Sequence, residues 1–245
     1  MVYSFPSSNG CCIPMGKKMR ILLDTANLKD IRYFNKYYPI EGVTTNPTIL
    51  SNEGGNVVEL LREIRSIIGD EKELHIQVTE TRFEKIIEEA EALVEAFGKN
   101  TFVKIPVTDT GLRVTKYLSD RGYGVTVTAV LTAAQGMLAS NAGASYVAPY
   151  ISRSENLCAD GVGTVADIAE IFKASKTKTQ ILAASFKTAK EVLDVAVAGC
   201  HAATIGSGIM KMLISHTTTD TSIAGFATDW NKAYGDTTLL KLLKK

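Results

Sequence analysis

The chain has 245 residues, of which 45% are hydrophobic and 22% charged, and its mean hydropathy is +0.06. This composition is ordinary for a globular protein, and a chain of this length can form one large core as a single domain. The net charge of +1 excludes a global field that would draw the protein to nucleic acid or to an anionic membrane. No apolar run approaches the roughly 20 residues that cross a bilayer, so we expect no membrane partner.

The first residues of the chain differ from a targeting signal. Lys17 and Lys18 follow the apolar residues of this segment, whereas a secretory signal carries its positive charges first. We therefore predict that residues 1–18 are a disordered or mis-started extension, with Met19 as the functional start. One domain is then expected over residues 19–245.

Eight short β-rich runs follow Met19, and segments with helical spacing lie between them. The predicted strands cover residues 20–24, 42–46, 73–78, 101–105, 125–130, 145–149, 180–185 and 202–205. These runs are nearly continuous in Val, Ile, Leu and Ala, as expected of parallel strands covered by helices. Residues 57–68, 82–97 and 165–174 repeat apolar positions at intervals of three and four, which predicts amphipathic helices.

Eight such units predict an α/β fold of the (β/α)₈ or TIM-barrel type, because an open doubly wound sheet usually stops near five or six strands. No GxGxxG turn or Walker-type loop supports a dinucleotide or P-loop site. One additional C-terminal helix is predicted over residues 223–234, which include Trp230. We expect this helix to pack across the barrel or onto a neighbouring molecule.

Polar side chains occur at or near the ends of seven predicted strands. In chain order they are Asp24, Thr44 with Asn46, Gln77, Lys104, Thr128, Tyr150 and Ser185. In a TIM barrel the C-terminal ends of the strands meet at one mouth, where the reacting groups lie. This pattern therefore predicts an active site at that mouth.

Lys104 is the most informative of these residues. Its neighbours in the run TFVKIP are apolar, so strand geometry leaves its amine facing the barrel interior or the rim. Burial lowers the pKa of an amine, and a neutral amine can attack a carbonyl carbon. The alternative is a structural lysine paired with Asp24. Asp24 is a candidate acid or base for a hydroxyl proton, a counter-ion for Lys104, or both.

The other polar residues divide into two groups. Gln77, Thr128 and Tyr150 are candidates for positioning a catalytic water, although closure of a strand end by a hydrogen-bonded side chain explains any one of them alone. Arg153 and Ser185 are candidates for a phosphate site, because arginine grips phosphate with two donors and a hydroxyl near a helix N-terminus adds another.

Two nearby features compete with these assignments or add to them. Lys187 is a second candidate amine or a further anion ligand, but it follows its strand in a more solvated turn, where its pKa would be less depressed. The segment Gly206 to Gly208 opens the last barrel helix and is a candidate phosphate cradle, although Gly and Ser are also ordinary turn residues.

The 4 cysteines and 3 histidines show no metal-ligand spacing. The cysteines form neither a CxxC pair nor a secreted-type disulfide framework, so we expect reduced thiols in the cytoplasm. The spacing of the cysteines and histidines also favours the absence of a metal site. Cys158 and Cys200 have no base beside them and are interpreted as packing or incidental residues. His75 lies early in its strand, at the mouth opposite the predicted site, and is interpreted as structural.

The strand-end motifs resemble those of the small transaldolase family, and within it the fructose-6-phosphate aldolase subfamily. The resembling segments are LLDTAN, GVTTNPTIL, FVKIPVT, GLRVTKYL, AAQGMLAS, AGASYVAPYISR, LAASFKT and ATDWNKAYG. They cover the chain in order from Met19 to about Gly235, and the pair TTNPT and VKIPVT is specific to the family. The chain departs from the family after strand 8, where it reads SGIMKML instead of a Pro-containing LPLDV-type turn.

The resemblance implies a role for each strand-end residue. Lys104 is then the Schiff-base lysine, and the phosphate ligands are Ser185 and Arg153. The residues that contact the dihydroxyacetone unit are then Asp24, Thr44 and Asn46.

Three positions separate the two activities of the family. Transaldolases typically have Glu at the position of Gln77, Phe at that of Tyr150 and an Asn–x–Thr pattern around the strand that carries Thr128. This sequence is similar to the aldolase branch at all three.

The resemblance therefore implies reversible cleavage of fructose 6-phosphate to dihydroxyacetone and glyceraldehyde 3-phosphate, without cofactor or metal. Three alternatives remain: a transaldolase moving the same unit between sugar phosphates, a triose-phosphate-type isomerase lacking its expected His, and a non-catalytic phosphosugar-binding barrel. Family members form pentameric rings or pairs of rings, so the resemblance also implies a homo-oligomer.

Overall fold

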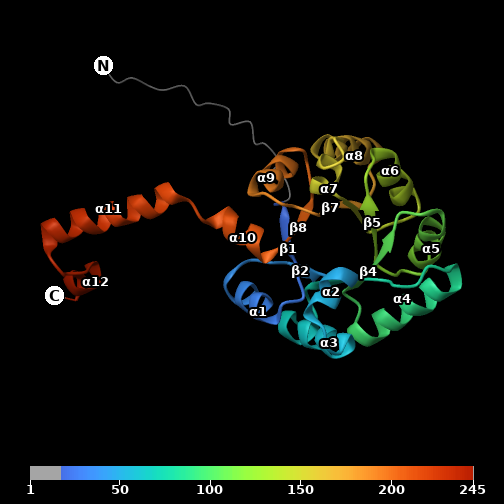
Figure 1. Ribbon diagram of the computed structural model, residues 1–245, viewed down its shortest axis with the longest axis horizontal. Helices are drawn as coiled ribbons and strands as arrows, with labels where there is room; N and C mark the ends of the chain where they lie inside the picture. The colour runs from blue at the N-terminus through green and yellow to red at the C-terminus, as the bar shows by residue number, and fades with distance from the viewer. Residues whose placement is uncertain (1–17, 245) are drawn as a thin grey trace, which may run out of the picture.

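The computed structural model describes residues 18–244, and the predicted extension lies outside them except for Lys18, which is exposed. The strands are β1 (Arg20–Asp24), β2 (Gly42–Thr44), β3 (Glu73–Gln77), β4 (Thr101–Pro106), β5 (Val125–Val130), β6 (Tyr146–Pro149), β7 (Gln180–Ala183) and β8 (Ala202–Ile205). Each strand pairs in parallel with the next, and β8 pairs with β1 to close the barrel (Figure 1). The TIM-barrel prediction is confirmed.

Helices surround the strands on the outside of the barrel, except that the last two extend away from it (Figure 1). In residues 18–244 they are α1 (Leu28–Tyr37), α2 (Pro47–Glu53), α3 (Val57–Ile68), α4 (Phe83–Phe97), α5 (Asp109–Ser119), α6 (Ala133–Asn141), α7 (Ile151–Glu155), α8 (Gly161–Ser175), α9 (Ala189–Val197), α10 (Ser207–Ile214), α11 (Thr217–Tyr234) and α12 (Leu239–Leu243). The predicted helix over residues 57–68 has these same bounds. The one over residues 165–174 begins four residues earlier because Asp160 accepts a hydrogen bond from Gly163 and caps the helix there.

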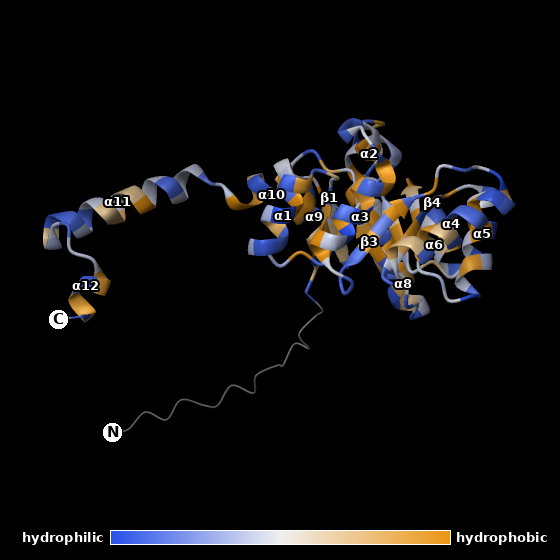
Figure 2. Ribbon diagram, turned by 90° about the horizontal axis from the view of Figure 1, so that it is seen from below, coloured by the Kyte–Doolittle hydropathy of each residue, from blue (hydrophilic) through white to orange (hydrophobic). Residues whose placement is uncertain are grey.

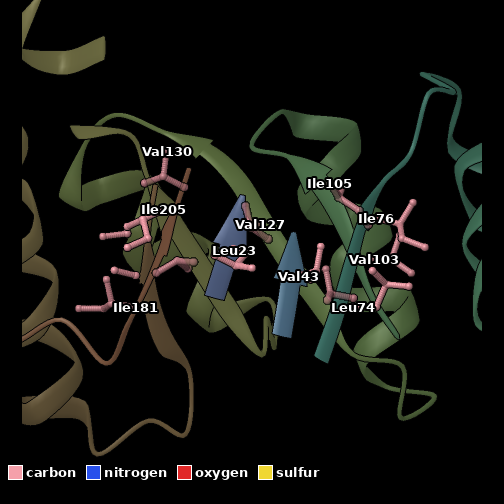
Figure 3. Packing of buried hydrophobic residues seen from close by; sticks show 14 of the residues in the cluster. Leu23, Val43, Leu74, Ile76, Val103, Ile105, Val127, Val130, Ile181 and Ile205 are labelled. Atoms are coloured by element: carbon pink, nitrogen blue, oxygen red, sulfur yellow. The ribbon is translucent and has the colours of Figure 1, made fainter. Parts of the chain in front are cut away.

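Successive strand residues face opposite sides of the sheet, so the strands contribute to two apolar clusters. The larger cluster combines strand residues such as Leu23, Val43 and Val103 with helix residues such as Phe34 and Ile64 (Figure 3). The smaller cluster contains Leu22, Tyr146, Leu182 and Ala202 and lies on the other face of the same strands. The apolar runs read from the sequence are therefore buried on both faces, which explains their lack of alternation.

Strand β5 contains an irregularity that the sequence pattern did not predict. Its register with β6 shifts between Val127 and Val130, and Ala129 lies in the left-handed region with a φ of 59°. A β-bulge bends a strand and re-aims the neighbouring side chain, and such bulges are frequent beside active sites. Thr128 lies within this irregular stretch, near the C-terminal end of β5, where the predicted site lies.

Helices α11 and α12 extend away from the barrel (Figures 1 and 2). No residue of α11 is buried, so the prediction that this segment packs across its own barrel is wrong. The chain turns away from the barrel after α10, where Ser215 has an extended conformation, and α11 begins at Thr217. Packing onto a neighbouring molecule stays a prediction. Among residues 18–244, no helix combines the length and the apolar character that a membrane span requires.

Candidate active site

A cavity of about 400 Å³ opens at the mouth formed by the C-terminal ends of the strands. Six of the nine predicted site residues line it: Asp24, Asn46, Lys104, Tyr150, Arg153 and Ser185. They come from β1, β4 and the segments after β2, β6 and β7, so the barrel brings together residues that are distant in sequence. The remaining three, Thr44, Gln77 and Thr128, lie behind or beside this lining.

Lys104 is buried in β4, with 6% of its surface exposed, and its amine reaches the cavity. The Nζ atom donates a hydrogen bond of 2.7 Å to the backbone carbonyl of Thr45. Burial lowers the pKa of Lys104, and the negative charge of Asp24 opposes this only in part. Within the described residues, Lys104 has no carboxylate close enough to form an ion pair, which disfavours the structural alternative.

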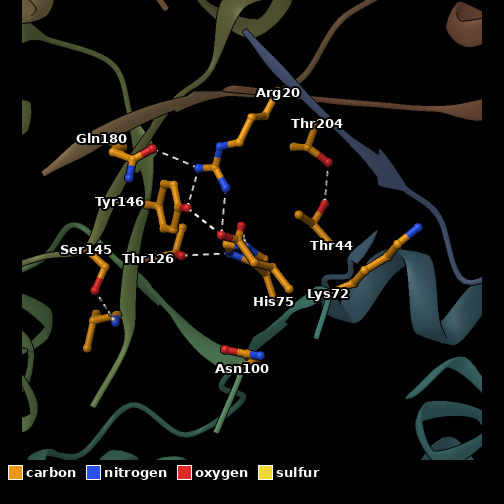
Figure 4. A network of polar contacts seen from close by, with 12 residues as sticks. Arg20, Thr44, Lys72, His75, Asn100, Thr126, Ser145, Tyr146, Gln180 and Thr204 are labelled. Atoms are coloured by element: carbon orange, nitrogen blue, oxygen red, sulfur yellow. Dashed lines mark hydrogen bonds and ion pairs between the residues drawn. The ribbon is translucent and has the colours of Figure 1, made fainter. Parts of the chain in front are cut away.

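Asp24 lies at the end of β1, and a threonine hydroxyl donates to its carboxylate. Thr44 on β2 donates a hydrogen bond of 2.7 Å to Asp24 Oδ1. The Thr44 hydroxyl also lies 2.6 Å from that of Thr204 on β8 (Figure 4). Thr44 is fully buried, so it supports Asp24 from inside the barrel and does not line the cavity itself.

Asn46 and Ser185 are fixed by the backbone around them. Asn46 is the N-cap of α2, where its Oδ1 accepts a hydrogen bond of 2.9 Å from Ile49 N, and it also lines the cavity. Ser185 lies in the left-handed region with a φ of 66°, a conformation that costs a non-glycine residue about 1 kcal/mol or more. Its carbonyl accepts a hydrogen bond of 2.8 Å from Ser152 N, which ties the end of β7 to α7.

Tyr150 connects the predicted water group with the predicted phosphate group. Its hydroxyl lies 3.2 Å from Thr128 Oγ1, and the guanidinium carbon of Arg153 lies 4.8 Å from the centre of its ring. Thr128 is almost completely buried, whereas Gln77 is half-buried and lies beside Lys104 in the ladder between β3 and β4. The three predicted water-positioning residues thus lie at the ends of β3, β5 and β6, and β4, which carries Lys104, lies between the first two of these strands.

Several residues of the cavity were not predicted from the sequence. Thr204, Ile49, Phe186 and Met212 belong to its lining. Lys187, which was predicted as a second candidate amine or a further anion ligand, also lines the cavity. Met212 lies on α10, whose sequence departs from the resembling family, so no motif pointed to it. The carbonyl of Thr45 was missed because a backbone acceptor carries no signal in the sequence.

The opposite mouth of the barrel holds a second polar group, here called the base cluster (Figure 4). It consists of Arg20, Glu73, His75, Thr126, Tyr146 and Gln180. Glu73 Oε1 accepts hydrogen bonds of 2.7 Å from both Arg20 and Tyr146. Burial alone would raise the pKa of Glu73, but hydrogen bonds from His75, Tyr146 and Arg20 lower it to about 2.

His75 is the most buried member of the base cluster. Burial lowers its pKa, so the imidazole is neutral at pH 7. A neutral ring donates from Nε2 to Glu73, at 3.2 Å, and accepts at Nδ1 from Thr126, at 2.8 Å. The ring stacks on Phe102 with 4.8 Å between centroids. These contacts agree with the interpretation of His75 as structural.

The remaining predicted features have simple surroundings. Cys200 is buried, and burial raises the pKa of its thiol to about 11, which agrees with a packing role, whereas Cys158 is exposed. Cys11 and Cys12 lie outside the described residues. Among residues 18–244, no three side chains of His, Cys, Asp or Glu lie together in the manner of metal ligands.

A family model described as Transaldolase/Fructose-6-phosphate aldolase matches residues 21–240. The chain belongs to this family. Its sequence is 38% identical over 213 residues to a probable fructose-6-phosphate aldolase of Streptococcus pneumoniae, covering 86% of this chain and 96% of that one. It is 40% identical over 212 residues to a probable transaldolase of Brevibacillus brevis, covering 86% and 98%. A probable transaldolase of Clostridium acetobutylicum is 38% identical over 216 residues, covering 88% and 99%.

This member of the transaldolase/fructose-6-phosphate aldolase family is therefore an enzyme of the aldolase or transaldolase kind, as predicted. The names of its relatives divide between the two activities. The chain is also similar in fold to a crystal structure of a mandelate oxidase variant, with a TM-score of 0.54 and 11% identity over 78% of this chain and 66% of that one. At this identity the likeness concerns the barrel alone.

Proposed function

We propose that the enzyme cleaves fructose 6-phosphate reversibly to dihydroxyacetone and glyceraldehyde 3-phosphate through a Schiff base on Lys104. The observation that carries the proposal is the buried amine of Lys104 at the mouth formed by the C-terminal strand ends, here called the catalytic mouth. This amine is hydrogen-bonded to a carbonyl and not to a carboxylate. Such an amine is neutral more often than an exposed lysine, and the neutral form is the nucleophile. Its hydrogen bond to Thr45 leaves the nitrogen lone pair unused.

The first half of the reaction forms the covalent intermediate. The amine of Lys104 adds to the C2 carbonyl of the sugar. Loss of one water and uptake of one proton from solvent, which the final hydrolysis returns, give an iminium ion. The C4 hydroxyl then gives its proton to Asp24, and the C3–C4 bond breaks. Its electron pair moves into the iminium to give an enamine, and glyceraldehyde 3-phosphate leaves.

The second half returns the enzyme to its starting state. The enamine carbon takes up a proton through a water held by Tyr150, Thr128 and Gln77, and one water then hydrolyses the iminium to release dihydroxyacetone. The water lost during imine formation is thereby replaced, and Asp24 gives up its proton. The close approach of the Tyr150 and Thr128 hydroxyls supports their action on one water molecule.

Arg153 and Lys187 supply positive charge for the sugar phosphate, and Ser185 supplies a hydroxyl donor. All three line the cavity beside Tyr150, which supports a phosphate at that side of the mouth. The guanidinium of Arg153 is oriented by the Tyr150 ring beneath it. The charge pattern therefore favours a phosphorylated sugar over a neutral one.

Transaldolase activity is the second candidate, and the names of two of the relatives above favour it. We favour the aldolase because a phenol and an amide stand at Tyr150 and Gln77. Tyr150 can move a proton through the bound water without a carboxylate, which allows free dihydroxyacetone to leave.

The test is the release of dihydroxyacetone from fructose 6-phosphate in the absence of an acceptor aldehyde. Steady release supports the aldolase, whereas turnover only after addition of erythrose 4-phosphate would establish the transaldolase. Binding without either product would leave the non-catalytic alternative.

The unburied C-terminal helix supports the proposal of a homo-oligomer. Ile223, Phe226, Trp230 and Tyr234 recur at helical spacing and form one apolar stripe along α11. Ile223 and Phe226 are 60% and 71% exposed, and a stripe of this kind marks an interaction surface. We expect a second copy of the chain to cover this stripe. Light scattering should then give a mass that is a multiple of 26.5 kDa, and the number of subunits should fall when residues 217–245 are removed. We also propose a cytoplasmic location for the enzyme.

A further inference from the structure

Thr204 is a polar side chain of the cavity for which the proposed reaction has no role. It lies in β8, has 3% of its surface exposed and lines the cavity that holds Lys104 and Asp24. A buried hydroxyl is costly unless it is hydrogen-bonded. Its partner in the described residues is the hydroxyl of Thr44, at 2.6 Å.

The positions of the hydrogens in this pair follow from simple counting. The Thr44 hydroxyl has one hydrogen, and that hydrogen is donated to Asp24 Oδ1 over 2.7 Å. The hydrogen between the two hydroxyls therefore belongs to Thr204, which donates to Thr44 Oγ1. The three residues form one directed chain that runs from Thr204 through Thr44 and ends on the Asp24 carboxylate.

The barrel geometry brings this chain together. Strand β1 lies between β8 and β2, and Asp24 is in register with Thr44. Thr204 is in register with Leu22, two residues before Asp24 on the same strand. The hydroxyls of the two flanking strands therefore meet across β1 (Figure 4).

We propose that Thr204 is a positioning residue for the reaction and acts on Asp24 through Thr44. Each hydroxyl of a chain polarises the next, so donation from Thr204 makes Thr44 a stronger donor to the carboxylate. This favours the ionised Asp24 that must accept the C4 hydroxyl proton, and it fixes the direction of that carboxylate. The inference rests on the proposed function, because it assumes that Asp24 is the base.

The chain predicts effects on turnover more than on substrate binding. Thr204→Val preserves the shape of the side chain and removes the donor, so kcat should fall about fivefold to thirtyfold while KM changes less than twofold. Thr204→Ser keeps the hydroxyl and should restore most of kcat.

A double-mutant cycle separates action through Thr44 from independent structural roles. Thr44→Val breaks the chain at its centre and should lower kcat more than Thr204→Val. If Thr204 acts through Thr44, the double variant should be no slower than Thr44→Val alone. Two additive losses would overturn the inference, since they would show that the hydroxyls act separately.

Thr126→Val provides the matched control. Thr126 is also a fully buried strand threonine whose hydroxyl has a single 2.8 Å partner, His75, but it belongs to the base cluster. The control should lower the unfolding temperature and leave kcat unchanged. A Thr204→Val variant that behaves in the same way would also overturn the inference.

Trapping with borohydride distinguishes failure of the inference from failure of the proposed function. Fructose 6-phosphate should label Lys104 in the wild type and in Thr204→Val. If the wild type is not labelled, the proposed function fails and the inference fails with it. If the wild type is labelled and turns over, but Thr204→Val equals it in kcat, only the inference fails.

Discussion

The two mouths of the barrel bury charged groups in opposite ways. In the base cluster, the Glu73 carboxylate meets Arg20, Tyr146 and His75, and these partners lower its pKa to about 2. At the catalytic mouth, Lys104 is more deeply buried, its hydrogen-bond partner among the described residues is a carbonyl, and burial lowers its pKa. One mouth stabilises the charged form of its central group, and the other disfavours it.

This difference separates a structural polar group from a reactive one. A buried charge with complete hydrogen bonding contributes to folding, and its removal is costly. A buried amine that lacks an ion-pair partner costs folding energy, and this cost leaves a neutral nucleophile in place. Changes at the catalytic mouth should therefore lower activity without lowering stability, and changes in the base cluster should do the reverse.

The largest effect is expected from Lys104→Met. Removal of the nucleophile should lower kcat by at least about 10³-fold, because no covalent intermediate can form. The folded pKa of Lys104 lies below its unfolded value, so protonation at neutral pH favours unfolding. Methionine removes this penalty, and calorimetry should show an equal or higher unfolding temperature. A variant that retains wild-type turnover would exclude Lys104 as the nucleophile.

Asp24→Asn should lower kcat by about 10²- to 10⁴-fold, since the amide cannot accept the hydroxyl proton. The charge of Asp24 raises the pKa of Lys104, so its removal should lower that pKa further. Imine formation should then begin at a lower pH than in the wild type. The rate of borohydride trapping, measured at a series of pH values, reports this change. A shift to higher pH would contradict this electrostatic link between the two residues.

In the base cluster, Glu73→Gln should destabilise the fold by about 3 kcal/mol and leave kcat of the folded enzyme unchanged. The folded pKa of Glu73, about 2, lies below the ordinary value of 4.5. Its contribution is therefore fully present above pH 4.5 and is lost as the pH falls toward 2. Urea unfolding across this window should show a loss of stability in the wild type that is absent from the variant. Reduced kcat with unchanged stability would reverse the roles assigned to the two mouths.

The protonation of His75 should give a smaller loss of stability at milder pH. Its folded pKa is lowered, so the neutral ring is favoured in the fold, and stability falls as the pH drops below its ordinary value of 6.5. His75→Phe should abolish this phase in urea unfolding and weaken the phase of Glu73, because the hydrogen bond from His75 is the first of the contacts that lower the pKa of Glu73. Persistence of both phases would show that another group titrates there.

The sequence was most informative about the barrel and the lining of its cavity. Apolar runs between helical spacings predicted β1, β5 and β8 with their observed bounds, because parallel strands must be buried on both faces. Strand ends converge in any TIM barrel, so Asp24, Lys104 and Tyr150 could be placed at one mouth before any geometry was known.

Other features depend on contacts that no sequence pattern encodes. The bulge at Ala129, the left-handed Ser185 and the carbonyl of Thr45 are properties of the backbone. Thr204 was missed because its role depends on a partner 160 positions away in sequence. The outward course of α11 was not predicted because its apolar stripe suits its own barrel and a neighbour equally well.

The most direct test of the central claim is borohydride reduction in the presence of fructose 6-phosphate, followed by peptide mapping with mass spectrometry. A neutral, buried amine in β4 predicts one reduced adduct, on the peptide that contains Lys104. The Lys104→Met variant should give none, although Lys187 still lines its cavity. An adduct on Lys187, or turnover without any adduct, would contradict the claim.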